Sequence, residues 1–158
     1  MVANFETATP GPVELPSAVL FACTMNAVRS PMAAALLRHL AGRRTYIESA
    51  GVRAGTLDPL AVEAMEEIGL EIAGHRPRRF EDLEDSSFDL VITLSPEAQH
   101  KAVELTRTHA TMVEYWPTAD PTIIEGSRQQ RLEAYRAVRD QLMTRLRQRF
   151  LAAPASDT

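Results

Sequence analysis

The chain has 158 residues, of which 45% are hydrophobic and 24% are charged, and its formal net charge at pH 7 is −4. This length and composition predict one soluble domain with its own core, and they leave no room for two full domains. The acidic balance argues against nucleic acid as the main ligand, because nucleic-acid-binding domains usually carry a basic excess. Cys23 is the only cysteine, so the chain cannot form an internal disulfide.

No apolar stretch approaches the roughly 20 residues of a membrane-spanning helix, and the first sixteen residues lack the basic and apolar regions of a signal peptide. We therefore expect a cytoplasmic protein without a membrane partner. Residues 1–16 are rich in Pro, Thr and Glu, and residues 152–158 are similar. This composition predicts a flexible N-terminal arm and a flexible C-terminal tail around a domain at residues 17–151.

Short apolar runs alternate with helical patterns along the domain. In chain order, the patterns predict a strand at 18–22, a helix at 30–42, a strand at 46–50, a helix at 58–69, a strand at 88–94, a helix at 96–107, a strand at 111–116 and a long helix from 128 to at least 150. This alternation predicts an α/β fold with a four-stranded parallel sheet flanked by helices on both faces. Ligands of such folds lie at the carboxyl ends of the strands.

The segment from Cys23 to Pro31, CTMNAVRSP, connects the first predicted strand directly to the first predicted helix. Five residues separate Cys23 from Arg29, which lets the backbone curl around one tetrahedral oxyanion with its N–H groups pointing inward. Arg29 can then donate two hydrogen bonds to a phosphoryl group, and the positive cradle favours the thiolate of Cys23. We expect the phosphate-binding loop to consist of Thr24, Met25, Asn26, Ala27, Val28 and Ser30 with these two residues.

Cleavage of a phosphate ester also requires an acid for the leaving oxygen, on another loop at the same edge of the sheet. Asp120 follows the fourth predicted strand, between Pro117 and Pro121. We therefore expect Asp120 to carry that proton. The histidines lack the spacing of metal ligands, so neither a metal nor a cofactor is expected. The cluster at 76–79, Arg-Pro-Arg-Arg, is interpreted as a solvated turn.

With these motifs, the chain resembles the low-molecular-weight protein tyrosine phosphatases, whose superfamily includes thiol-dependent arsenate reductases. The resemblance covers about residues 17–150, and the segments that carry it are VLFACTMNAVRSPMAAALLR (19–38), ESAG (48–51), DPLAVEAMEEIGLEIAGHRPRRF (58–80), FDLVITL (88–94) and ADP (119–121). It implies a four-stranded parallel sheet and two-step hydrolysis of phosphomonoesters. It also implies that Cys23 is the nucleophile, Arg29 the phosphate clamp and Asp120 the acid and then the base. Asn26 and Ser49 would support the loop.

The chain departs from the family pattern at several positions. Met25 stands where the family usually has Gly, and Val28 stands where many members have a second Cys. Thr122 follows the Asp-Pro pair where tyrosine-specific members tend to have aromatic residues, and residues 51–56 contain neither Trp nor Tyr. The loop chemistry is compatible with these changes, whereas selectivity for aromatic substrates is expected to be weak.

We predict a cysteine-dependent phosphomonoester hydrolase of the protein tyrosine phosphatase type. Its substrate would be a phosphotyrosyl protein or a small aryl phosphate, and inorganic phosphate would be its product and ligand. Two alternatives stay open: an arsenate reductase that uses an external thiol, and a non-enzymatic binder of phosphate or phosphopeptide. Pro31 in RSPMA favours the phosphatase over the reductase, and the presence of Cys, Arg and Asp together counts against a binder.

Overall fold

The computed structural model describes residues 15–84, 87–107 and 109–151. The predicted arm at 1–16 lies outside these residues except for Leu15 and Pro16, and the predicted tail at 152–158 lies outside them entirely. Leu15 packs against the core, and the carbonyl of Pro16 accepts a hydrogen bond of 3.0 Å from the hydroxyl of Thr45.

All of the predicted strands and helices are present, together with two short 3-10 turns at Phe80–Asp82 and Pro121–Ile123 that the sequence patterns did not predict. The elements are β2 (Ala18–Cys23), α2 (Arg29–Ala41), β3 (Tyr46–Gly51), α3 (Pro59–Glu66), β4 (Leu90–Thr93), α4 (Pro96–Leu105), β5 (Met112–Tyr115) and α5 (Arg128–Phe150). Helix α3 ends three residues before the predicted Gly69, because that glycine adopts a φ of 79° and closes the helix end. None of the helices in the described residues is long and apolar enough to cross a membrane.

The four strands form one parallel sheet in the order β3-β2-β4-β5, which confirms the predicted fold class. Cys23 at the end of β2 lies opposite Gly51 at the end of β3, and Thr93 at the end of β4 lies opposite Tyr115 at the end of β5. The carboxyl ends of all four strands therefore meet at one edge of the sheet. The loops that leave this edge carry the predicted site residues.

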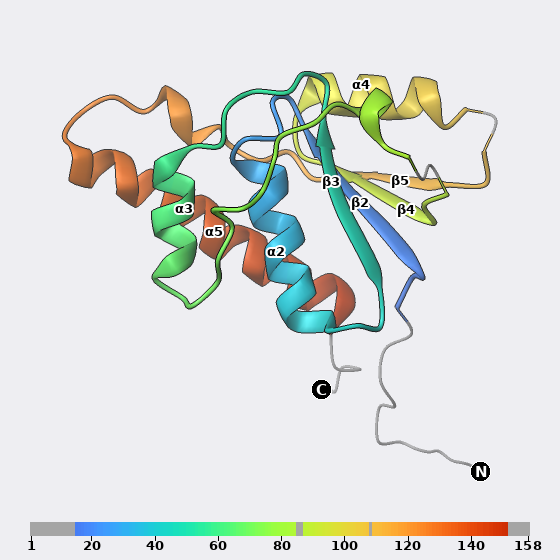
Figure 1. The fold of residues 1–158 in the computed structure, drawn as a ribbon, viewed down its shortest axis with the longest axis horizontal. Coiled ribbons are helices and arrows are strands. Elements are labelled where there is room, and N and C mark those ends of the chain that lie inside the picture. Colours follow the sequence, from blue (N-terminus) through green and yellow to red (C-terminus); the bar gives the residue numbers. More distant parts are fainter. Residues whose placement is uncertain (1–14, 85–86, 108, 152–158) are drawn as a thin grey trace, which may run out of the picture.

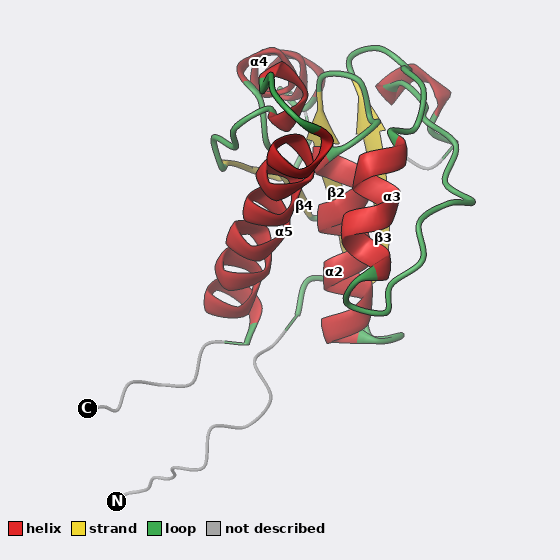
Figure 2. Ribbon diagram, turned by 90° about the vertical axis from the view of Figure 1, so that its left-hand side faces the viewer, coloured by secondary structure: helices red, strands yellow, loops and turns green. Residues whose placement is uncertain are grey.

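Helices cover both faces of the sheet. Helices α2, α3 and α5 lie on one face and α4 lies on the other (Figure 1), and Figure 2 shows α2, α3 and α5 as neighbours with α4 set apart from them. In the central strand β2, Val19 and Phe21 pack into the larger core cluster, whereas Leu20 packs into the smaller cluster below α4. All six residues of β2 are buried, which explains why this strand is a continuous apolar run rather than an alternating one.

Candidate active site

The segment between β2 and α2 forms a loop whose carbonyl groups face outward. The carbonyl oxygens of residues 23–25 and 27 accept hydrogen bonds of 2.8 to 3.2 Å from N–H groups of the loop at 52–58. The N–H groups of residues 24–28 make no hydrogen bond with any residue that the structure describes. Because buried backbone N–H groups are almost always paired, these free donors at the start of a helix form a site suited to an anion.

Asn26 holds this loop in its unusual conformation. It has a φ of 54°, the only positive φ of a non-glycine residue in the described part of the chain. Its amide nitrogen donates to the hydroxyls of Ser30 and Ser49, at 2.8 and 2.9 Å. Its Oδ1 accepts from the backbone N–H of Arg78 at 2.9 Å and lies 3.0 Å from Nε2 of His75. The buried side chain thus joins the loop to β3 and to the segment at 75–78.

Cys23 lies at the floor of the loop and is only 2% exposed. Its Sγ is 2.9 Å from Oγ of Ser30. Because the same Oγ already accepts a hydrogen bond from Asn26, its own proton is free to point at the sulfur. The hydroxyl of Ser30 is therefore placed to donate to the sulfur of Cys23. The next loop residue, Thr24, donates its hydroxyl to Oγ of Ser95 at 2.9 Å, which ties the loop to the start of α4.

Arg29 connects the loop to the segment that follows β5. Its Nη1 donates to the carbonyl of Thr118 at 3.0 Å, and its Nη2 is 3.9 Å from Oδ2 of Asp120. The other carboxylate oxygen of Asp120 accepts two hydrogen bonds from Thr122, from the N–H at 3.0 Å and from the hydroxyl at 2.7 Å. One oxygen of Asp120 therefore caps its own turn, while the other faces Arg29.

A pocket of about 190 Å³ brings most of these residues together. It is lined by Cys23, Met25, Ala27, Val28, Arg29, Gly55, Thr56, Asp58, Asp120 and Thr122, none of which is aromatic. Thr24, Asn26, Ser30 and Ser49 lie behind the lining and support it through the contacts above. Within the residues described, no three His, Cys, Asp or Glu side chains gather closely enough to hold a metal ion.

Asp58, which the sequence pattern predicts only as a helix start, also lines the pocket from the start of α3. Its Oδ1 accepts from the backbone N–H of Leu60 at 2.9 Å, and its Oδ2 accepts from the hydroxyl of Tyr135 at 2.5 Å. Burial and this hydrogen bond raise the pKa of the Tyr135 hydroxyl above its ordinary value, so it stays a donor. Asp58 thereby links α3, α5 and the pocket.

The interpretation of residues 76–79 as a solvated turn is wrong for Arg78. Its backbone N–H binds Asn26, its Nε donates to the carbonyl of Ser49 at 3.2 Å, and its guanidinium pairs with Glu48. His75 beside it also contacts Asn26. No local motif marks these contacts, because Arg78 and His75 lie 52 and 49 residues from Asn26 in the chain.

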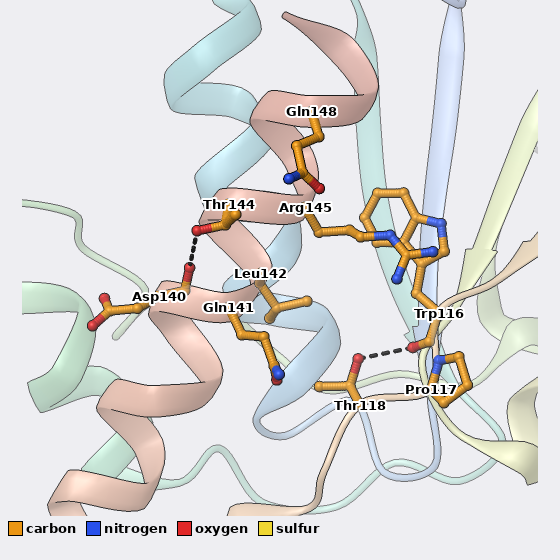
Figure 3. Close-up of a pocket in the computed structure, with 9 residues that line it drawn as sticks. All are labelled: Trp116, Pro117, Thr118, Asp140, Gln141, Leu142, Thr144, Arg145 and Gln148. Carbon is orange, nitrogen blue, oxygen red and sulfur yellow. Dashed lines mark hydrogen bonds between the residues drawn. The ribbon is translucent and has the colours of Figure 1, made fainter. Parts of the chain in front are cut away.

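A larger hollow of about 410 Å³ lies between α5 and the start of the segment after β5 (Figure 3). The guanidinium of Arg145 stacks 4.8 Å from the ring centre of Trp116, and the hydroxyl of Thr118 bonds the carbonyl of Trp116. This hollow contains neither the thiol nor the free N–H donors. The reactive groups are therefore in the smaller pocket.

Comparisons with known proteins place the chain among its relatives. A family model described as low molecular weight phosphotyrosine protein phosphatase matches residues 18–155. The chain belongs to this family. The resemblance seen in the sequence is thus confirmed. An arsenate reductase of Bacillus subtilis is 33% identical over 134 residues, which cover 82% of this chain and 92% of the relative.

Solved structures of the same fold include arsenate reductases and phosphatases. An arsenate reductase in the phosphate-binding state is 26% identical, with a TM-score of 0.66, and the match covers 87% of this chain and 99% of that one. The arginine phosphatase YwlE, in a mutant with a phosphorylated active-site serine, is 30% identical with a TM-score of 0.68, covering 85% and 93%. Family membership therefore leaves the reaction itself to be inferred from the site.

The burial of His75 makes the stability of the fold pH-dependent. Burial lowers the pKa of His75 below its ordinary value, and the nearby guanidinium groups of Arg78 and Arg38 act in the same direction. The unfolded chain therefore takes up a proton first as the pH falls below about 6.5. The stabilising contribution of neutral His75 is complete above that pH and is lost as the pH falls further.

We expect the free energy of unfolding of the wild type to fall relative to that of His75→Gln between about pH 7.5 and about pH 5. Urea unfolding of both proteins at the two pH values measures this difference directly. The histidines common to both proteins cancel in the comparison. An equal difference at the two pH values would contradict the assignment.

Proposed function

We propose that this chain is a cysteine-dependent phosphomonoester hydrolase that works through a cysteinyl-phosphate intermediate. The observation that supports this most is the ring of unpaired N–H groups at residues 24–28, in the pocket that also contains Cys23 and Arg29. These donors suit three oxygens of a bound phosphoryl group, and the thiol below them suits attack on its phosphorus. The proposed substrate is a phosphotyrosyl protein or a small aryl phosphate, and a solved relative described as an arginine phosphatase adds phosphoarginine to the substrates worth comparing.

In the first proposed step, the thiolate of Cys23 attacks phosphorus and the bond from phosphorus to the leaving oxygen breaks. Arg29 and the loop N–H groups hold the other three oxygens through the transition state, where electrostatic stabilisation matters most. Asp120 donates its proton to the leaving oxygen, so the product leaves as a neutral alcohol or phenol. Oδ2 of Asp120, 3.9 Å from Arg29, is the oxygen available for this transfer.

In the second step, water attacks the cysteinyl-phosphate. Asp120, now a carboxylate, takes a proton from that water, the sulfur–phosphorus bond breaks and inorganic phosphate is released. The electron pair of this bond returns to Cys23, so the thiolate is regenerated without an oxidant or a reductant. A single cysteine is therefore sufficient for the whole cycle, and the chain contains one.

Arsenate reduction is the second candidate, and the names of the curated relatives favour it. Arsenate is a tetrahedral oxyanion like phosphate, so the same loop suits it. Reduction of As(V) to As(III) takes two electrons, which two thiols supply when they form a disulfide. Because the chain has one thiol, an external thiol would have to complete the reaction. This requirement is the reason for placing hydrolysis first.

Loss of the nucleophile should separate binding from turnover. Cys23→Ser should still bind inorganic phosphate but lose turnover of p-nitrophenyl phosphate, because the loop donors remain. Arg29→Lys should lower kcat by about 10²- to 10³-fold, since an ammonium group cannot donate the two parallel hydrogen bonds of a planar guanidinium. Steady-state kinetics with and without EDTA, together with phosphate binding by calorimetry, measure both effects. Full inhibition by EDTA, or turnover by Cys23→Ser at the wild-type rate, would contradict the mechanism. A wild type that binds phosphate but turns over no ester would favour a non-enzymatic phosphate binder.

The role of Asp120 depends on the leaving group. Asp120→Asn should slow the first step by about 10²- to 10⁴-fold for alkyl phosphates, whose leaving oxygen needs a proton. The loss should be much smaller for p-nitrophenyl phosphate, whose leaving group is already stable as an anion. Single-turnover rates across a series of leaving groups give the comparison. Equal losses across the series would assign Asp120 to structure instead.

The two candidate reactions differ in their need for a second thiol. Wild-type protein should release inorganic phosphate from aryl phosphates without any added thiol. Arsenite should form only when glutathione, mycothiol or a similar small thiol is present, and more slowly than phosphate under matched conditions. Intact mass after peroxide should find oxidised Cys23 and no internal disulfide. Thiol-dependent arsenite release that outpaces ester hydrolysis would make reduction the function of the chain.

A further inference from the structure

Met25 is the residue of the loop whose side chain reaches solvent. It is 40% exposed, whereas its neighbours from Asn26 to Ser30 are all buried. It lines the same pocket as Cys23 and Arg29. A group attached to a phosphoryl oxygen in this loop would have to leave through the pocket opening, because attack from Cys23 on the floor requires the leaving group on the opposite side. The side chain of Met25 is therefore positioned to contact the leaving group.

The backbone and the side chain of Met25 are both fixed against Gly55. The N–H of Gly55 donates to the carbonyl of Met25 at 2.9 Å. A Cβ atom at Gly55 would lie 3.1 Å from Cε and 3.2 Å from Cβ of Met25, which is tighter than ordinary van der Waals contact. The missing side chain at Gly55 thus leaves the space that the thioether of Met25 occupies.

Four other lining residues are polar: Asp58, Asp120, Thr56 and Thr122. Met25 is the largest apolar side chain among the lining residues, and no aromatic ring is present to stack on a substrate. A methionine side chain has three rotatable bonds and a polarisable sulfur, so it adapts to apolar groups of different shape and contacts aromatic rings favourably. These properties suit a wall that accepts several leaving groups.

We propose that Met25 is a specificity-determining residue that contacts the leaving group and directs the pocket toward phosphomonoesters with apolar, and especially aryl, leaving groups. This inference rests on the proposed hydrolase function. It assigns binding of the phosphoryl group to the loop N–H groups and Arg29, and binding of the organic group to Met25. Inorganic phosphate has no organic group, so the side chain of Met25 contributes nothing to its affinity, although the backbone N–H of Met25 does.

The test compares Met25→Ala with wild type on ligands that differ only in the organic group. Met25→Ala should lower kcat/KM for p-nitrophenyl phosphate by about two- to tenfold, mainly through KM. It should change kcat/KM for glycerol phosphate little, and it should leave the inhibition constant of inorganic phosphate unchanged. Met25→Leu, which keeps the apolar volume, should recover most of the loss. Met112→Ala removes a 64% exposed methionine at the start of β5 and is the matched control.

A second variant moves Met25 without removing it. Gly55→Ala should displace the thioether and reproduce the same pattern, a raised KM for the aryl ester with unchanged inhibition by phosphate. Equal effects of Met25→Ala on the ester and on phosphate would mean that the residue shapes the loop, and an unchanged KM would mean that it does not meet the leaving group. If the wild type hydrolyses the ester, either of these two results overturns the inference about Met25 and leaves the proposed function standing. A wild type that hydrolyses no ester overturns the proposed function and this inference with it.

Discussion

The site depends on one backbone constraint: residues 23–25 and 27 must turn their carbonyl groups outward so that the N–H groups of the loop are left for an anion. The outward carbonyls are satisfied by the loop at 52–58, which lies beside them because β2 and β3 are adjacent parallel strands. This approach is close. A Cβ at Gly51 would lie 2.5 Å from the carbonyl oxygen of Arg53 and 2.8 Å from the nitrogen of Asn26, so only glycine fits there. The order of the strands and the glycine at the end of β3 are thus conditions for anion binding.

Asn26 maintains that constraint from the inside. A left-handed conformation costs a non-glycine residue about 1–3 kcal/mol, and the hydrogen bonds of the Asn26 side chain, worth about 1 kcal/mol each, offset it. These bonds reach Ser49 in β3 and Arg78 and His75 in the segment after α3. The loop is therefore held in place before any anion binds, which is what electrostatic stabilisation of a transition state requires. Burial of His75 in this network is also the reason why its protonation state is coupled to folding.

The fold and the place of the candidate site could be predicted from the sequence because their signals are local. The apolar run of β2 has no polar alternation since both faces of that strand are covered, and Asp58 before Pro59 gives a helix start that the structure retains. Cys23 and Arg29 lie within one short segment. The supporting contacts could not be predicted in this way. Three arginines lie at 76–79, and only the tertiary structure shows that Arg78 is the one that contacts Asn26 and Glu48. The group that binds Arg29 is the backbone carbonyl of Thr118, which any residue type could supply, so the sequence does not mark it.

The loop itself does not distinguish phosphate from arsenate, because the two anions share charge and tetrahedral shape. The distinction lies in what happens to the electrons after Cys23 has attacked. In hydrolysis the electron pair of the sulfur–phosphorus bond returns to the sulfur. In reduction the electron pair of the sulfur–arsenic bond goes to arsenic, while a second thiol attacks the cysteine sulfur and forms a disulfide. Val28, beside Arg29, is 6% exposed and belongs to the larger core cluster, so an apolar side chain stands where many members of the family have a second cysteine. The carboxylate of Asp120, held by its bonds to Thr122 with one oxygen facing Arg29, is the group that would complete the proposed hydrolytic cycle. A chain with this arrangement has a candidate residue for proton transfer and no second cysteine for internal electron transfer, which supports the proposal of hydrolysis over reduction.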